Sequence, residues 1–192
     1  MKRVFDIIAA SVMLVLAMPL LLLSAVAVWI SSEGPVIFAQ ARWGRGGILF
    51  RCLKFRTMVV EAEDWLLSDP DLQATHKENG FKLDLKEDPR VTEVGQILRK
   101  TYLDELPQLV NVIRGDMSLV GPRPIVGEEL EWYGEDKAEY LSVRPGIFGM
   151  WTAQGRQRVN YPDRALLELD YVRDTTMLRE ARILVGHIPV LM

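Results

Sequence analysis

The residues best suited to chemistry lie between positions 98 and 124, where the sequence reads LRKTYLDELPQLVNVIRGDMSLVGPRP. Two adjacent carboxylates, Asp104 and Glu105, stand just ahead of Pro107. Because proline is tolerated in the first turn of a helix but not deep inside one, a helix is expected to begin here, with both acids at its N-terminus. The partial positive charge of that end keeps carboxylates ionised and attracts phosphate.

Two neighbouring carboxylates can share a divalent cation, and oxygen ligands suit Mg²⁺, which leaves coordination positions for substrate phosphates. Basic side chains whose geometry matches phosphate oxygens crowd the same segment: Arg99, Lys100, Arg114 and Arg123. This composition indicates a phosphoryl-transfer site that uses Mg²⁺. A plainer interpretation stays open, in which Asp104 is only a helix N-cap and Glu105 a first-turn acid.

The element that must place this site is an apolar segment, because residues 7–32 carry no charged side chain and are interrupted by Met18-Pro19. A continuous helix over residues 7–30 would be about 36 Å long, enough to cross a membrane. Basic residues flank both ends, which favours the cytoplasmic side for each. Pro19 kinks a helix. We therefore predict a re-entrant membrane helix broken at Pro19, with a kinked single-pass helix as the alternative.

Charge is divided unevenly along the chain. The first sixty residues hold seven Lys/Arg against two Asp/Glu, although the whole chain has a formal charge of −3. The basic part is therefore the part nearest the expected membrane, which predicts contact with anionic lipids and gives no support to nucleic-acid binding. The single cysteine, Cys52, excludes an internal disulfide, fits a reducing compartment and is expected to be packed in the core.

The remaining pattern predicts an α/β fold, mostly helical with a small β-hairpin. About 160 residues follow the membrane segment, which suits one compact domain. We expect a membrane helix over 1–33 and a cytoplasmic catalytic domain with interfacial helices over 34–192. Strands are expected at 36–39 and 48–55, a polar loop at 71–86, and helices at 57–67, 91–100, 107–113, 163–172 and 177–192.

Several motifs resemble one known family. The chain opens with KRVFDIIAA and continues with GPVIFAQ and with KFRTM at residues 54–58. DPRVTEVGQILRKTYLDELPQLVNVIRGDMSLVGPRP follows at residues 88–124, and RPGIFGMWTAQGR at residues 144–156. In this order and spacing they resemble the bacterial sugar transferase family, the monotopic polyprenyl-phosphate phosphoglycosyl transferases, from Lys2 nearly to the end.

The resemblance implies a reaction and a place. A UDP-sugar gives its sugar 1-phosphate to a polyprenyl phosphate such as undecaprenyl phosphate, releasing UMP and initiating exopolysaccharide or O-antigen assembly. By position, Asp104 is the nucleophile that forms a covalent aspartyl intermediate, and Glu105 is the expected Mg²⁺ ligand. The family works at the bacterial inner membrane, with its catalytic domain on the cytoplasmic face.

The other site residues follow from the same resemblance. Arg99 is expected to hold the acceptor phosphate and Arg123 the donor diphosphate, although each would also be unremarkable as a structural arginine. Lys54 and Arg56 are expected to contact phosphate or lipid headgroups. The candidate donor-pocket residues are Gln154, Arg156 and Arg158.

Departures from the family pattern leave some points open. Met18-Pro19 replaces the Ser-Pro that many members have at the break, and Tyr102 and TAQGR replace common residues near the donor site. PRPIVGEELEWYG resembles members that transfer hexose 1-phosphate, galactose 1-phosphate among them. A non-catalytic membrane scaffold for polysaccharide assembly and a binding module without turnover stay as alternatives. The sugar, the pathway and the oligomeric state, a homodimer included, are not determined.

Overall fold

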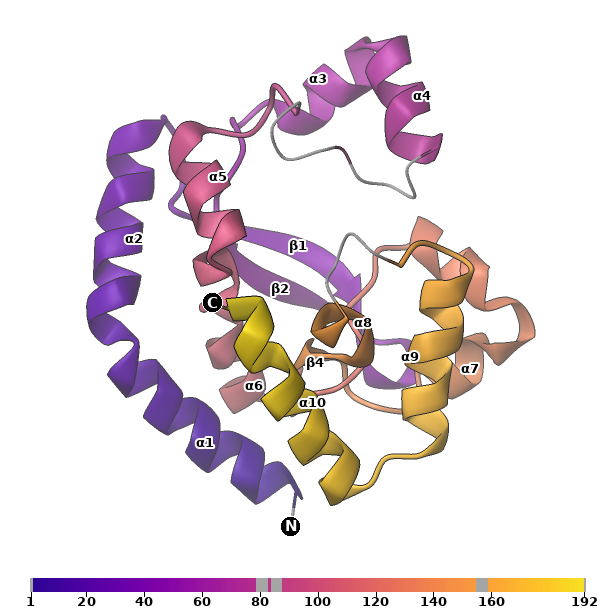
Figure 1. Cartoon of the computed structure of the whole chain (residues 1–192). Helices are drawn as coiled ribbons and strands as arrows, with labels where there is room; N and C mark the ends of the chain where they lie inside the picture. Colours follow the sequence, from indigo (N-terminus) through magenta and orange to yellow (C-terminus); the bar gives the residue numbers. More distant parts are fainter. Residues whose placement is uncertain (1, 79–82, 84–87, 155–158, 192) are drawn as a thin grey trace. The chain divides into compact units, whose positions relative to one another are not determined.

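The computed structural model describes residues 2–78, 83, 88–154 and 159–191. The chain is mostly helical, with β1 (Ile37–Trp43) and β2 (Leu49–Phe55) in one small sheet (Figure 1). A second sheet holds β3 (Ser118–Val120) and β4 (Gly146–Phe148). Two compact units can be distinguished. Unit 1 comprises Met1–Leu16, Ala39–Leu53 and Gln108–Met192, and unit 2 comprises Ala17–Phe38 and Lys54–Pro107. The predicted division at residues 33 and 34 stays a prediction.

Unit 1 contains most of the helices. They are α1 (Lys2–Leu16), α6 (Gln108–Arg114), α7 (Lys137–Tyr140), α8 (Met150–Ala153), α9 (Asp163–Arg173) and α10 (Met177–Leu191), with the 3₁₀ turns η1 (Arg45–Gly47) and η3 (Glu128–Asp136). The helices predicted near 107–113, 163–172 and 177–192 are confirmed. In Figure 1, α10 lies beside α8 and β4.

The apolar helix α1 is tied to the rest of unit 1 by its charged first turns. The buried carboxylate of Asp6 accepts hydrogen bonds from the Ser118 hydroxyl at 2.7 Å and the Leu119 backbone N–H at 3.3 Å. Arg3 donates to the carbonyl of Ile113 at 3.1 Å, at the end of α6. Lys2 pairs with Glu180 at 2.7 Å. The basic residues that the sequence assigned to the membrane flank therefore also bind protein groups.

The predicted break in the apolar segment is present. Helix α1 ends at Leu16, and α2 (Met18–Ser31) begins after the single residue Ala17, with Pro19 in its first turn, where a missing N–H breaks no helical hydrogen bond. Among the described residues no single helix is long and apolar enough to cross a membrane, but α1 and α2, bent by 62°, pass that test as a pair. Whether the pair is re-entrant or spans stays a prediction.

Sheet β3–β4 was not foreseen. The two strands are parallel, with Ser118 opposite Gly146 and Val120 opposite Phe148. A side chain at Gly146 has no room, because an added Cβ would lie 2.0 Å from the backbone nitrogen of Gly121. Strands of three residues are too short to show alternation in the sequence.

The hairpin formed by β1 and β2 confirms the predicted strands, although β1 runs to Trp43 and so is longer than expected. Gly46 and Gly47 adopt positive φ angles of 71° and 75° in the connecting turn, which glycine does without strain. The Asn111 side chain accepts from the Leu53 N–H at 2.9 Å and donates to the Arg51 carbonyl at 2.8 Å. This contact fixes the return strand within unit 1.

Unit 2 contains α2, α3 (Ala62–Ser68), α4 (Pro70–Glu78), α5 (Glu93–Lys100) and the 3₁₀ turn η2 (Leu103–Glu105). Its core is made by Val28, Phe55 and Leu98, and α2 lies alongside α5 (Figure 1). Thr92 caps α5 by accepting from the Gly95 N–H at 2.9 Å. Gly95 lies so close to Thr57 that an added Cβ would be 2.0 Å from its carbonyl oxygen. Helix α5 is therefore pressed against the KFRTM segment.

Two expectations in unit 2 were wrong. The helix predicted at 57–67 begins only at Ala62, because Met58 pairs with Val91 in an antiparallel bridge. Residues 71–78, expected as part of a loop, belong to α4, whose first N–H groups donate to the Asp69 carboxylate at 3.0–3.1 Å. Asp69-Pro70 thus ends one helix and starts another. The rest of the predicted loop lies largely outside the described residues.

Candidate active site

The paired carboxylates lie in η2 rather than at the start of α6. Tyr102, just before them, has a left-handed backbone with φ of 59°, unusual for a residue other than glycine. Asp104 and Glu105 form the 3₁₀ turn that follows, and α6 begins only at Gln108. The expectation that both acids lie at the N-terminus of that helix is therefore wrong. The alternative of Asp104 as its N-cap fails for the same reason.

Both carboxylates are buried within unit 2, with 4% of Asp104 and 5% of Glu105 exposed. Burying a carboxylate is costly unless a partner compensates its charge. The Lys54 ammonium, on β2, lies 3.0 Å from Glu105 Oε1, and its side chain is 18% exposed. The structure thus brings together Asp104, Glu105 and Lys54, three of the predicted site residues.

Two predicted arginines in unit 2 have different surroundings. Arg99, half-buried on α5, donates from Nε to the Thr57 hydroxyl at 2.8 Å. Arg56 is buried, and its two Nη atoms donate to the carbonyls of Pro35 and Ser32 at 2.5 and 2.6 Å. Arg56 therefore holds the loop that follows α2, and its predicted contact with phosphate or headgroups stays a prediction.

The pair Asp104 and Glu105, which we call the dyad, can be tested for its fit to Mg²⁺. No group of three or more His, Cys, Asp or Glu side chains that could hold a metal occurs within the described ranges. Two adjacent carboxylates remain, and they suit Mg²⁺ because this ion usually takes only one or two carboxylates and completes its shell with water and substrate phosphates. Since Lys54 pairs with Glu105, a bound cation would compete with that ammonium group.

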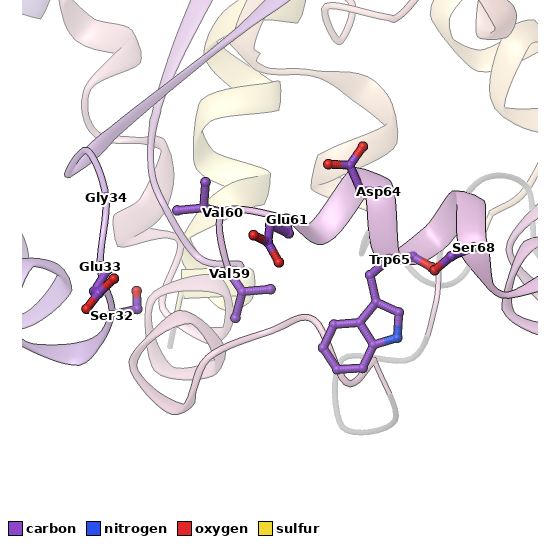
Figure 2. Close-up of a pocket in the computed structure, with 9 residues that line it drawn as sticks. All are labelled: Ser32, Glu33, Gly34, Val59, Val60, Glu61, Asp64, Trp65 and Ser68. Atoms are coloured by element: carbon purple, nitrogen blue, oxygen red, sulfur yellow. The ribbon is translucent and has the colours of Figure 1, made fainter.

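Unit 2 also contains a cavity of about 900 Å³ beside the end of α2 (Figure 2). Its nine lining residues are Ser32, Glu33, Gly34, Val59, Val60, Glu61, Asp64, Trp65 and Ser68. Three of them are acids and none is Lys or Arg. A phosphate group is therefore better accommodated near Lys54 and Arg99 than in this cavity.

A second group of buried and half-buried charges occurs in unit 1, and we call it the arginine–tryptophan cluster: Arg42, Arg123, Glu129, Trp151, Arg164 and Glu168. The Arg164 guanidinium carbon lies 4.2 Å from the centre of the Trp151 ring, and that of Arg123 lies 5.3 Å from it. Arg164 also pairs with Glu129 at 2.8 Å. Arg42 lies 3.5 Å from the same carboxylate.

Aromatic residues surround this cluster. Tyr133 and Tyr140 pack against Ile125 and Leu169 in the core of unit 1, and their ring centres are 4.0 Å apart. The Tyr140 hydroxyl donates a short hydrogen bond to the carbonyl of Arg123. Arg123 stands between Pro122 and Pro124, so its backbone is stiff and its half-buried side chain is held in place. This is a suitable arrangement for binding an anion.

The pKa values of the two carboxylates in the cluster are shifted in opposite directions. Burial raises the pKa of Glu168 to about 7, against the opposing charges of Arg164 and Arg123. Burial alone would also raise the pKa of Glu129, but Arg164, Arg42 and Arg123 together hold it below its ordinary value. Perturbed carboxylates of this kind gather at functional sites.

The remaining predicted site residues lie in different places. Arg123 belongs to the arginine–tryptophan cluster. Gln154 is exposed at the end of α8 and lines an open cavity of about 520 Å³ with Asn160 and Asp163. Arg156 and Arg158 lie outside the described residues.

Sequence reasoning missed Arg42, Glu129, Trp151, Arg164 and Glu168. Trp151 lies inside the recognised RPGIFGMWTAQGR motif and could have been singled out. Arg164 and Glu168 are four residues apart on α9, a spacing typical of an exposed helix pair, so nothing local indicates that both are buried.

The family model for bacterial sugar transferases matches residues 1–192, the whole chain. The chain belongs to the bacterial sugar transferase family. The resemblance seen in the motifs is thus confirmed, and the dyad and the arginine–tryptophan cluster are features of a member of this family.

Curated relatives give the family match more detail. The chain is 44% identical over 190 residues to the undecaprenyl-phosphate galactose phosphotransferase of Salmonella typhimurium, covering 96% of this chain but 39% of that protein. It is 44% identical over 196 residues to the exopolysaccharide production protein ExoY of Rhizobium meliloti, covering 98% and 84%. A Caulobacter vibrioides UDP-glucose:undecaprenyl-phosphate glucose-1-phosphate transferase is 37% identical over 205 residues, covering 100% and 69%. Some relatives are thus much longer than this chain.

Proposed function

We propose that this chain transfers a sugar 1-phosphate from a UDP-sugar to undecaprenyl phosphate, releasing UMP and initiating exopolysaccharide or O-antigen assembly. The observation that carries the proposal is the buried, adjacent pair Asp104 and Glu105 within unit 2, in which Glu105 is paired with Lys54. Support comes from relatives named as undecaprenyl-phosphate sugar phosphotransferases. Family membership alone would not assign roles to these side chains.

In the proposed mechanism Asp104 acts as the nucleophile. A carboxylate oxygen of Asp104 attacks the sugar-bearing phosphorus of the donor, the bond from that phosphorus to the bridging oxygen breaks, and UMP leaves with the electron pair. An oxygen of the acceptor phosphate then attacks the same phosphorus, and the carboxylate leaves as it was. One displacement is thus divided into two, which suits a water-soluble donor and a lipid acceptor.

Glu105, together with Asp104, would hold Mg²⁺. When bound, this ion supplies neutralisation of the charge on the phosphoryl oxygens. Within the chain itself, the Lys54 ammonium neutralises the charge of Glu105 before the substrate binds. Arg99, whose position is fixed by Thr57, is proposed to bind the acceptor phosphate. Arg123 is proposed to bind the donor diphosphate, because its backbone is rigid and its side chain half-buried.

The proposed site of action is the cytoplasmic face of a bacterial inner membrane, with α1 and α2 as a re-entrant pair in contact with anionic lipids. The break between Leu16 and Met18, with its 62° bend, supports this topology. Single cysteines placed at positions 2 and 34 should both be shielded from an impermeant reagent added from the periplasm. Labelling at position 2 alone would indicate a spanning helix. Pro19→Leu should shift the population toward spanning, since it restores a continuous helix.

The covalent step can be tested with the donor alone. Incubation with Mg²⁺ and UDP-glucose or UDP-galactose, without lipid, should release at most about one UMP per active site and leave a sugar phosphate on Asp104. Intact-mass measurement should detect the adduct, undecaprenyl phosphate should discharge it, and Asp104→Asn should not form it. If UMP appears only when lipid is present, a direct displacement is the better mechanism. No UMP release under any condition would favour a scaffold or binding module.

A further inference from the structure

Glu168 is a buried carboxyl that the proposed mechanism does not use. It lies on α9 with no exposed surface, and neither of its carboxylate oxygens has a hydrogen-bond partner of ordinary geometry among the described residues. An added Cβ at Gly149, the residue before α8, would lie 3.7 Å from its Oε1. The carboxyl therefore points toward the segment that carries Trp151.

The same carboxyl lies within electrostatic reach of Arg123. The backbone N–H and the charge of Arg123 both act on Glu168, as does the charge of Arg164 on its own helix. Arg123 is thus approached from two sides, by Glu168 and by the Tyr140 hydroxyl that binds its carbonyl. The titratable or charged groups that act electrostatically on Glu168 are Arg123, Glu129, Tyr133, Tyr140, Tyr161, Arg164 and Tyr171.

We propose that Glu168 is a positioning residue that couples binding of the donor diphosphate at Arg123 to uptake of a proton. When Glu168 is ionised, its charge competes with the diphosphate for Arg123 and Arg164. When it is neutral, the arginines are available to the donor. The identity of the donor as a nucleoside diphosphate sugar rests on the proposed function.

The charges of the arginine–tryptophan cluster explain why donor binding should take up a proton and not release one. Three arginines face two carboxylates, and Glu129 is firmly ionised by its two close arginine contacts. Glu168 is therefore the carboxyl whose protonation changes the net charge of the cluster near neutral pH. A dianion arriving beside Arg123 adds negative charge near Glu168, which favours the neutral carboxyl. By linkage, donor affinity must then depend on pH.

Calorimetry can measure this coupling. In an Asp104→Asn background, which prevents turnover, UDP-glucose and UDP-galactose are titrated at pH 7 in PIPES and in Tris, two buffers with different ionisation enthalpies. Binding should take up about half a proton or less, since a group with a pKa near 7 is half protonated at that pH. In the active protein, the KM for the donor should rise about fivefold from pH 6 to pH 8 if donor binding raises the pKa of Glu168 by about one unit.

Matched variants complete the test. Glu168→Gln should bind donor without proton uptake and with a KM that no longer varies with pH, whereas Glu168→Asp should retain both effects. Glu128→Gln, an exposed acid on η3, should behave like the parent protein. Equal proton uptake by the parent and Glu168→Gln would overturn this inference and leave the proposed function intact. If neither sugar nucleotide binds, both fail. If Glu168→Gln does not fold, the parent protein is tested by itself. A binding enthalpy that is the same in both buffers then overturns the inference.

Discussion

The two units compensate buried charge by different means. In unit 2, Glu105, the neighbour of Asp104 in the chain, is paired with Lys54, whose side chain is 18% exposed and ends in a flexible ammonium group. In unit 1, the arginine–tryptophan cluster fixes Arg164, only 1% exposed, between Glu129 and two aromatic rings. Lysine is a mobile point charge, whereas arginine is a rigid, stacked fork. The first arrangement suits groups that exchange partners during a reaction, and the second suits groups that hold a substrate still.

The largest expected effect falls on the dyad. Asp104→Asn should lower sugar-phosphate transfer at least about a thousandfold, because an amide is not a competent nucleophile here. Glu105→Gln should slow transfer less than Asp104→Asn does, and it should raise the Mg²⁺ concentration required for activity. UMP release and lipid product measure both effects. Turnover by Asp104→Asn within tenfold of the parent would remove the covalent mechanism and with it the proposed role of unit 2.

Substrate affinity provides a more specific contrast between the units. Arg123→Ala should raise the KM for the donor about tenfold to a hundredfold, the loss expected for a charge-assisted hydrogen bond, and leave the KM for the acceptor nearly unchanged. Arg99→Ala should do the reverse. Steady-state kinetics with each substrate varied in turn measure the two constants. The assignment of the donor diphosphate to Arg123 and of the acceptor phosphate to Arg99 is refuted if both variants raise the same KM.

Lys54→Gln tests whether the lysine in unit 2 is a replaceable partner. Removing the ammonium removes the group that competes with Mg²⁺ for Glu105. The Mg²⁺ concentration at half-saturation should therefore fall by a few fold, and the maximal rate should also fall. Arg51→Gln, which removes an exposed positive charge from the same strand, is the control and should change neither. A higher Mg²⁺ requirement in Lys54→Gln would mean that Lys54 helps to hold the ion or its phosphates.

The smallest expected effect is on stability in unit 1. Because burial raises the pKa of Glu168 from 4.5 to about 7, its neutral form stabilises the fold fully below pH 4.5, and that contribution is lost as pH rises through 7. Glu168→Gln should therefore gain stability relative to the parent between pH 5 and pH 8, by at most about 3 kcal/mol. Thermal melting in detergent should show a shift of a few degrees. A constant difference between the two proteins across this range would contradict the raised pKa.

Much of the fold is readable from local signals. The break near Pro19, the hairpin with its glycine turn, and the helices α5, α9 and α10 all follow from patterns within a few residues of each element. The dyad was recognised from its motif and composition in the same way. Helix α4 was missed because its sequence is polar, and its start depends on an Asp69 cap that the Asp-Pro pair disguised as a stop.

The sequence by itself determined that Asp104 and Glu105 are neighbours in a motif of a phosphoryl-transferring family and that an apolar segment precedes them. Only the tertiary structure decided that Lys54 compensates Glu105 and that Asp6 fixes α1 through Ser118, 112 positions away. It alone also buried Arg164 and Glu168, whose spacing looks like an exposed pair. The physical reason is that propensity and capping act over one or two turns, whereas the ionisation of a carboxyl depends on burial and on charges brought close by distant parts of the chain.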